Sequence, residues 1–146
     1  MKAYVLSNEE SHAHGASHKI VITWSDLLTA ALTNTKAIYP FTGTAPIGTR
    51  VAAVRARLKT AFVGCATLTC AVGDGGSTGR NLAAADMKAA AGTWYFSSPS
   101  TTTPSGFNAA DTVDALFTAT TNNLDQLTAG EVEIYLTIHQ DNRLAA

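Results

Sequence analysis

The stretch EVEIYLTIH, residues 131–139, alternates apolar and polar side chains without a break. Successive side chains of an extended chain point to opposite faces of a sheet, so this alternation places the aliphatic side chains together on one face. One apolar and one polar face are typical of an antiparallel strand that covers a core on one side and meets solvent on the other. The stretch therefore predicts a half-buried strand and points to an all-β fold. The aliphatic residues are Val132, Ile134, Leu136 and Ile138.

Residues 49–63 show the same period of two over a longer stretch. Their aliphatic and aromatic side chains fall on one face and their basic side chains on the other, which a helical period does not reproduce. This segment is the longest strand candidate of the chain. Ala52, Val54, Ala56, Leu58 and Phe62 share the apolar face, whereas Arg55, Arg57 and Lys59 share the basic face.

Five shorter strand candidates bring the total to about seven strands, separated by turns rich in glycine, proline and threonine. Many short strands without full-length helices between them favour an antiparallel β-sandwich, and a jelly roll is the favoured topology. The segment 97–106 contains two prolines and predicts an exposed loop. The shorter candidates are residues 19–24, 35–41, 65–72, 93–96 and 111–120.

Two short helical insertions are expected within the sandwich. Residues 25–32 follow a strand candidate and begin with Ser25, a favourable N-cap residue, and residues 81–88 begin with Asn81, which can cap in the same way.

The chain divides into an arm and a body. Residues 1–16 are polar and lack periodicity, which predicts an extended N-terminal arm, and residues 17–146 have the size of a single β-sandwich domain. Within the arm, Tyr4, Val5 and Leu6 are apolar, and we expect them to bind a partner as the arm orders on it.

The glycine-rich segment VGDGGSTGR, residues 72–80, superficially resembles a phosphate-binding loop. A Walker loop needs a lysine followed by serine or threonine after its second glycine, and the segment has no lysine. The dinucleotide motif needs a third glycine where Thr78 stands. We interpret the segment as a tight reversal with positive φ angles, leading from a strand into a capped helix. No catalytic or cofactor-binding residue is predicted, and the chain is not expected to be an enzyme.

Histidines and cysteines do not indicate a metal site. His12, His14 and His18 lie close in sequence, but the segment carries no cysteine, so solvated histidines are expected and no metal ligand is assigned. Cys65 and Cys70 are five residues apart around one strand, a separation that disfavours a local disulfide and predicts buried free thiols.

Composition excludes other partners. The chain is 14% charged with a net charge of −1, which leaves no electrostatic basis for direct nucleic-acid binding. The apolar runs are too short for a membrane span, and the N-terminus lacks the apolar core of a signal peptide.

The basic face of residues 49–63 has two interpretations. Arg55, Arg57 and Lys59 can keep the sheet surface solvated and pair with Glu131 and Glu133 of a neighbouring strand. They can also contact another subunit or a partner protein.

Four segments occur in an order that resembles a family: HKIVITWSDL at 18–27, VGDG at 72–75, NL at 81–82 and GEVEIY at 130–135. Together they resemble small jelly-roll virion proteins of tailed bacteriophages, of the capsid decoration or cement type. The resemblance implies a homo-oligomer, dimer or trimer, that is made in the host cytoplasm and sits on the major capsid protein at the virion surface. It implies stabilisation of the shell, with no cofactor and no catalysis.

Other functions stay open at this stage. Similar domains occur in phage tail and fibre proteins. A carbohydrate-binding sandwich could use Trp94 and Tyr95 with the loop at 97–106, and an enzyme could use the glycine-rich segment.

Overall fold

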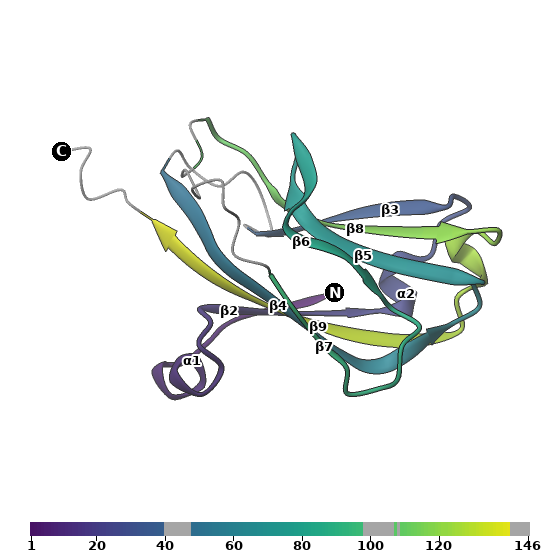
Figure 1. The fold of residues 1–146 in the computed structure, drawn as a ribbon, viewed down its shortest axis with the longest axis horizontal. Coiled ribbons are helices and arrows are strands. Elements are labelled where there is room, and N and C mark those ends of the chain that lie inside the picture. The colour runs from purple at the N-terminus through teal and green to yellow at the C-terminus, as the bar shows by residue number, and fades with distance from the viewer. Residues whose placement is uncertain (40–47, 98–106, 108, 141–146) are drawn as a thin grey trace.

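A computed structural model of the chain describes residues 1–39, 48–97, 107 and 109–140. Its strands form two antiparallel sheets that face each other (Figure 1). The five-stranded sheet contains, in spatial order, β1 (Lys2–Val5), β2 (His18–Thr23), β9 (Ala129–Gln140), β4 (Thr49–Val63) and β7 (Trp94–Phe96). The four-stranded sheet contains β3 (Thr33–Tyr39), β8 (Val113–Thr120), β5 (Thr67–Asp74) and β6 (Ser77–Asp86).

The strand order identifies the topology. Strands β2, β9, β4 and β7 lie side by side in one sheet, and β3, β8, β5 and β6 lie side by side in the other. This interleaved order, in which the last strand of the body returns to a central place beside the first, is that of a jelly roll built from two Greek keys. The predicted antiparallel β-sandwich and its jelly-roll topology are confirmed.

The core lies between the sheets. The aliphatic residues of β9 from Val132 to Leu136 are fully buried, as the alternation of residues 131–139 predicted. The apolar face of β4 is also buried from Val54 onward, but Ala52 is exposed. A register irregularity between Val51 and Ala53 opposite β9 shifts the alternation at that point.

The prediction that residues 1–16 form an extended arm is wrong. Residues 2–5 are not an arm but form β1, which pairs antiparallel with β2 at the edge of the five-stranded sheet. Residues 8–14 form the helix α1 (Asn8–His14), which begins with a capping box between Ser7 and Glu10. The sequence of residues 2–5 gave no local signal for β1. This edge strand of four residues is stabilised by its pairing with β2 and not by a periodic pattern of its own.

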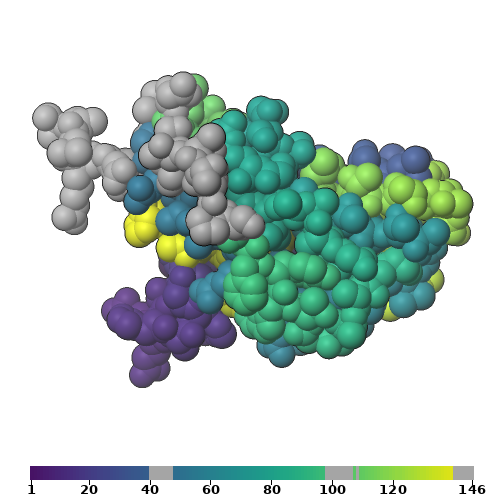
Figure 2. All heavy atoms as spheres, in the orientation of Figure 1, coloured from purple at the N-terminus to yellow at the C-terminus, as the bar shows by residue number. Residues whose placement is uncertain are grey.

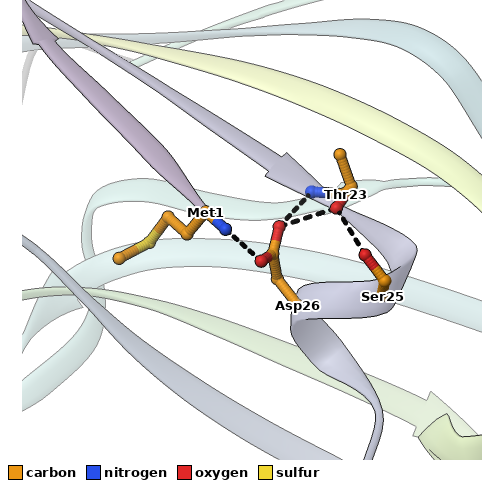
Figure 3. A network of polar contacts seen from close by, with 4 residues as sticks. All are labelled: Met1, Thr23, Ser25 and Asp26. Carbon is orange, nitrogen blue, oxygen red and sulfur yellow. Dashed lines mark hydrogen bonds and ion pairs between the residues drawn. The ribbon is translucent and has the colours of Figure 1, made fainter.

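The first residue also helps to hold β1 in place. The N-terminal ammonium of Met1 forms an ion pair with the carboxylate of Asp26, which lies three residues after the end of β2 (Figure 3). The other oxygen of that carboxylate accepts hydrogen bonds from the backbone N–H and the hydroxyl of Thr23, at 2.8 and 2.7 Å. These contacts outweigh the cost of burying the carboxylate and lower the pKa of Asp26.

Both predicted helices need correction. Where a two-turn helix was expected at 25–32, the structure has the single turn α2 (Trp24–Leu27), and its N-cap residue is Thr23 rather than Ser25. Residues 81–88 are not a helix, because β6 extends to Asp86 and pairs with β5. The alanines of this segment favour a helix in isolation, but the edge of β5 supplies backbone partners and the core accepts Leu82 and Ala85.

The glycine-rich segment forms the predicted tight reversal, which connects β5 to β6. Its glycines, however, are needed for a different reason from the one predicted. None of its glycines has a positive φ. Gly73 is instead required because a Cβ there would lie 1.9 Å from the backbone oxygen of Ser77. The carboxylate of Asp74 closes the turn by accepting hydrogen bonds from the backbone N–H groups of Gly76 and Ser77, at 3.0 and 2.8 Å.

Cys65 and Cys70 are free and buried, as predicted. Complete burial raises the pKa of Cys70 to about 12. The predicted loop at 97–106 lies, except for Ser97, outside the described residues. Within the described part of the chain, no helix is long and apolar enough to cross a membrane.

Candidate functional site

The outer side of the five-stranded sheet carries a row of alternating aromatic and basic side chains. Pairing between neighbouring strands places one residue of each strand directly beside the next. These residues alternate along their strands with residues that point into the core, so they face outward. In spatial order from β1 to β7 the row is Tyr4, Lys19, Tyr135, Arg55 and Phe96.

A second row lies two residues further along each strand. It places Glu133 at the centre, beside Arg57, with Trp94 at the β7 edge. We refer to the two rows, together with Lys59 and Glu131, as the basic–aromatic face. In spatial order the second row is Lys2, Val21, Glu133, Arg57 and Trp94.

Glu133 is the centre of a polar network on this face. Its carboxylate forms ion pairs with Lys19 Nζ at 2.7 Å and with Arg57 at 3.8 Å, and it accepts a hydrogen bond from the Tyr135 hydroxyl at 3.1 Å. Burial alone would raise the pKa of Glu133, but the hydrogen bond and charge of Lys19 outweigh it and lower that pKa. The same hydrogen bond raises the pKa of Lys19. The network therefore keeps both groups charged over a wide pH range.

The centre of the face is covered, which corrects the expectation of a half-buried β9. Glu133 is 4% exposed and Tyr135 is 3% exposed, although both lie on the outer side. The His14 ring at the end of α1 stacks on the Tyr135 ring with centroids 5.0 Å apart, and the Trp94 ring lies 5.7 Å from it. Lys19 Nζ lies 5.6 Å from the same ring. The C-terminal end of α1 thus contacts this sheet through His14, while the helix itself, which has no buried residue, projects from the sheet (Figure 1).

The two edges of the face remain exposed. Tyr4 on β1 is 46% exposed, and at the opposite edge Trp94 and Phe96 are 38% and 63% exposed. The Trp94 and Phe96 rings are nearly parallel, with centroids 6.2 Å apart, and the Arg57 guanidinium lies 5.7 Å from the Trp94 ring. Aromatic rings and arginine on a rigid strand are the residue types enriched at protein interfaces.

Two of the sequence-predicted residues pair as expected. Arg57 contacts Glu133, and Lys59 Nζ lies 3.0 Å from Glu131. This confirms pairing with the acids of the neighbouring strand. Contact of Arg55, Arg57 and Lys59 with another subunit or partner stays a prediction.

The structure also places a residue of the predicted arm beside the predicted basic face of residues 49–63. Tyr4, expected on an arm, lies in the same row as Arg55. Val5 is 75% exposed and alternates to the other side of β1, and Leu6 follows the strand with its backbone N–H bonded to Ser17. Sequence reasoning missed Lys19, Tyr135 and Phe96 as members of the face.

Charge is distributed unevenly between this face and the remainder of the chain. Five of the ten lysines and arginines lie on it, together with the two acids Glu131 and Glu133. The face therefore carries 5 − 2 = +3, and because the whole chain carries −1, the remainder carries −1 − 3 = −4. The five basic residues are Lys2, Lys19, Arg55, Arg57 and Lys59.

The histidines of the N-terminal segment do not converge. The His12 ring bonds the Asn8 carbonyl at 2.8 Å, His14 stacks on Tyr135, and the His18 ring lies 4.8 Å from the ring of Tyr39. Across the described residues, no group of three or more histidine, cysteine, aspartate or glutamate side chains is placed to hold a metal ion.

Comparison of the chain with protein-family models, with curated proteins and with solved structures found no match.

Proposed function

We propose that this chain is a virion structural protein without catalytic activity, of the capsid decoration or cement type. In this role it binds the outer surface of a major capsid protein and stabilises the shell. The observation that carries the proposal is the basic–aromatic face, whose residues together carry +3 whereas the remainder of the chain carries −4.

The face has the composition of a docking surface. Opposite potentials orient two proteins during encounter, and they penalise partners of the wrong charge. Exposed Tyr4, Trp94 and Phe96 supply apolar area at the two edges, while the Glu133 network holds the cations between them in fixed positions. An acidic surface of a shell protein, with apolar contacts at its rim, is the complement of such a face.

The fold and the sequence resemblance support the same role. Jelly rolls are common in viral capsid domains, although they also form lectin domains, so this support is an analogy at the level of fold. The segments at 18–27, 72–75, 81–82 and 130–135 give the resemblance to phage virion proteins. In this proposal the protein acts as a homo-oligomer, a dimer or trimer, because shells present their binding sites in symmetric groups.

The test is the number of copies per particle. Virions of the phage that carries this gene are purified, and quantitative mass spectrometry measures the ratio of this chain to the major capsid protein. A ratio corresponding to hundreds of copies supports a shell protein, and a handful of copies supports the tail or fibre alternative. Particles without the chain would overturn the proposal.

A further inference from the structure

A groove runs between two strand edges on the side where the sandwich is open. It has a volume of about 440 Å³ and lies between β6, the edge of the four-stranded sheet, and β7, the edge of the five-stranded sheet. Residues 79–86 form one wall, and Tyr95 and Phe96 form the other. The teal and green spheres of this part of the chain occupy the centre of the face seen in Figure 2. The volume is within the range of small-molecule sites.

One wall of the groove is aromatic. Phe96 is the most exposed of the three aromatic side chains on β7, and the Trp94 ring, which does not line the groove, stacks beside it at 6.2 Å and 18° between planes. The Tyr95 hydroxyl donates a hydrogen bond to the Asp86 carbonyl, which fixes β7 against β6 beside the groove. Because β7 is also paired with β4, the backbone that carries Tyr95 and Phe96 is held in place beside the groove.

The other wall is small and polar. Gly79 and the three alanines at 83–85 leave room beside the strand, and Arg80, Asn81 and Asp86 provide both hydrogen-bond donors and acceptors. The Arg80 charge is already matched by Asp74, whose carboxylate lies 2.9 Å from it. The remaining charges therefore do not favour an anionic ligand.

We infer that this groove binds a neutral saccharide. A pyranose ring has an apolar C–H face and a rim of hydroxyl groups. Its apolar face would stack on Phe96, while its hydroxyl groups would bond Asn81 and Asp86 on the opposite wall. An aromatic wall facing a wall of paired donors and acceptors matches this chemistry better than it matches a purely apolar peptide.

This inference goes beyond the proposed function and does not depend on it. It shares Tyr95 with the sequence-based carbohydrate hypothesis, which used Trp94 and Tyr95 with the segment 97–106, but its second wall is β6 in place of that segment. A decoration protein with such a groove could attach particles to surface glycans, and a tail or fibre component could use it in the same way.

The test uses the isolated chain, labelled with ¹⁵N, and a panel of named saccharides. Glucose, galactose, mannose, N-acetylglucosamine and their β-linked tetrasaccharides are titrated at millimolar concentration, with sialyllactose as the anionic comparison, and amide chemical shifts are followed. The expected result is saturable shifts confined to residues 79–86 and 94–96 with at least one of them. Phe96→Ala should weaken that affinity at least tenfold, whereas Tyr4→Ala, the matched exposed aromatic at the opposite edge, should not change it.

A second variant keeps the proposal testable if Phe96→Ala alters the β7 edge. Ala84→Phe fills the groove from the β6 side and removes no hydrogen bond of a side chain, so it should abolish the shifts while the remaining amide spectrum is preserved. Absence of shifts with every neutral saccharide would overturn the inference. So would binding of sialyllactose alone, shifts outside the groove, or self-association that depends on Phe96, since the last outcome would make the groove an interface between copies.

Discussion

The outer faces of the two sheets differ sharply although the sheets share one core. The five-stranded sheet presents long basic and aromatic side chains around a buried glutamate, whereas the four-stranded sheet presents mostly threonine and alanine. Two rows on its outer face cross β3, β8 and β5. The first consists of Thr33, Thr118 and Thr69, and the second of Thr35, Leu116 and Ala71. Short side chains on a pleated surface need few partners beyond their neighbours.

The difference shows that the polar network around a buried charge lies on the outer face of the five-stranded sheet. On the five-stranded sheet, the buried carboxylate of Glu133 needs two cations and a hydroxyl to compensate for its lost hydration. The threonine face carries no comparable desolvation cost, so it can serve as a passive surface. We therefore propose that recognition uses the basic–aromatic face. Four predictions follow from the comparison of the two faces, and the second of them tests that proposal directly.

The largest effect is expected from removing the central carboxylate. Glu133→Gln leaves Lys19 and Arg57 without their shared partner, and we expect a loss of about 2 kcal/mol in the free energy of unfolding. Thr118→Ala on the threonine face should cost less than about 0.5 kcal/mol. Urea denaturation of both variants measures the difference. Equal losses would show that the two faces contribute alike.

The next effect concerns binding to shells. Arg55→Glu reverses a charge on the basic–aromatic face, and we expect about a tenfold loss of affinity for purified capsids that lack this chain. Lys88→Glu changes the net charge equally but lies two residues after the end of β6, outside the face, and should bind as the unmodified chain does. Cosedimentation at two salt concentrations measures both. If the chain is abundant in virions and Lys88→Glu has the larger effect, the docking face is wrong while the proposed function stands.

The third effect is a dependence of stability on pH. The pKa of Glu133 is lowered on folding, so its stabilising contribution is present above its ordinary value of 4.5 and is lost as the pH falls through the lowered value. The pKa of Lys19 is raised, so its contribution persists below 10.5 and is lost as the pH rises further. Denaturation of the unmodified chain and of Glu133→Gln should therefore converge in acid below 4.5. A constant difference between them down to the lowest pH would contradict this.

The smallest effect concerns β1. Asp26→Asn removes the charge that holds the N-terminal ammonium, and we expect less than about 1 kcal/mol of destabilisation because both groups are partly exposed. Amide exchange at residues 2–5 should nevertheless become faster, with residues 131–139 unchanged as the internal control. Exchange that is equally fast in both segments would mean that β1 is not a separately opening unit.

The sequence was most informative where alternation was strict. The period of two in residues 49–63 predicted β4 with its bounds, and residues 131–139 predicted β9 to within two residues at each end. It was wrong at residues 81–88, where local helix preference was overridden by pairing with β5, and at residues 1–16, where β1 depends on β2.

The candidate site was predictable only in part. The basic residues 55, 57 and 59 were found because they share one strand face, and Glu131 and Glu133 were named as their partners. Lys19, Tyr135 and Phe96 were not found, because their neighbours come from strands far apart in sequence. Pairing between β2, β9, β4 and β7 brings them into one row.

The sequence by itself therefore determined the class of fold, the core faces of the long strands and the low charge of the chain. Those properties depend on side-chain spacing within a single segment, which a linear pattern records. Tertiary structure alone decided that Glu133 and Tyr135 are buried, that five cations share one face, and that a groove opens between β6 and β7. These depend on strand register and on packing across the sandwich, which no local pattern contains.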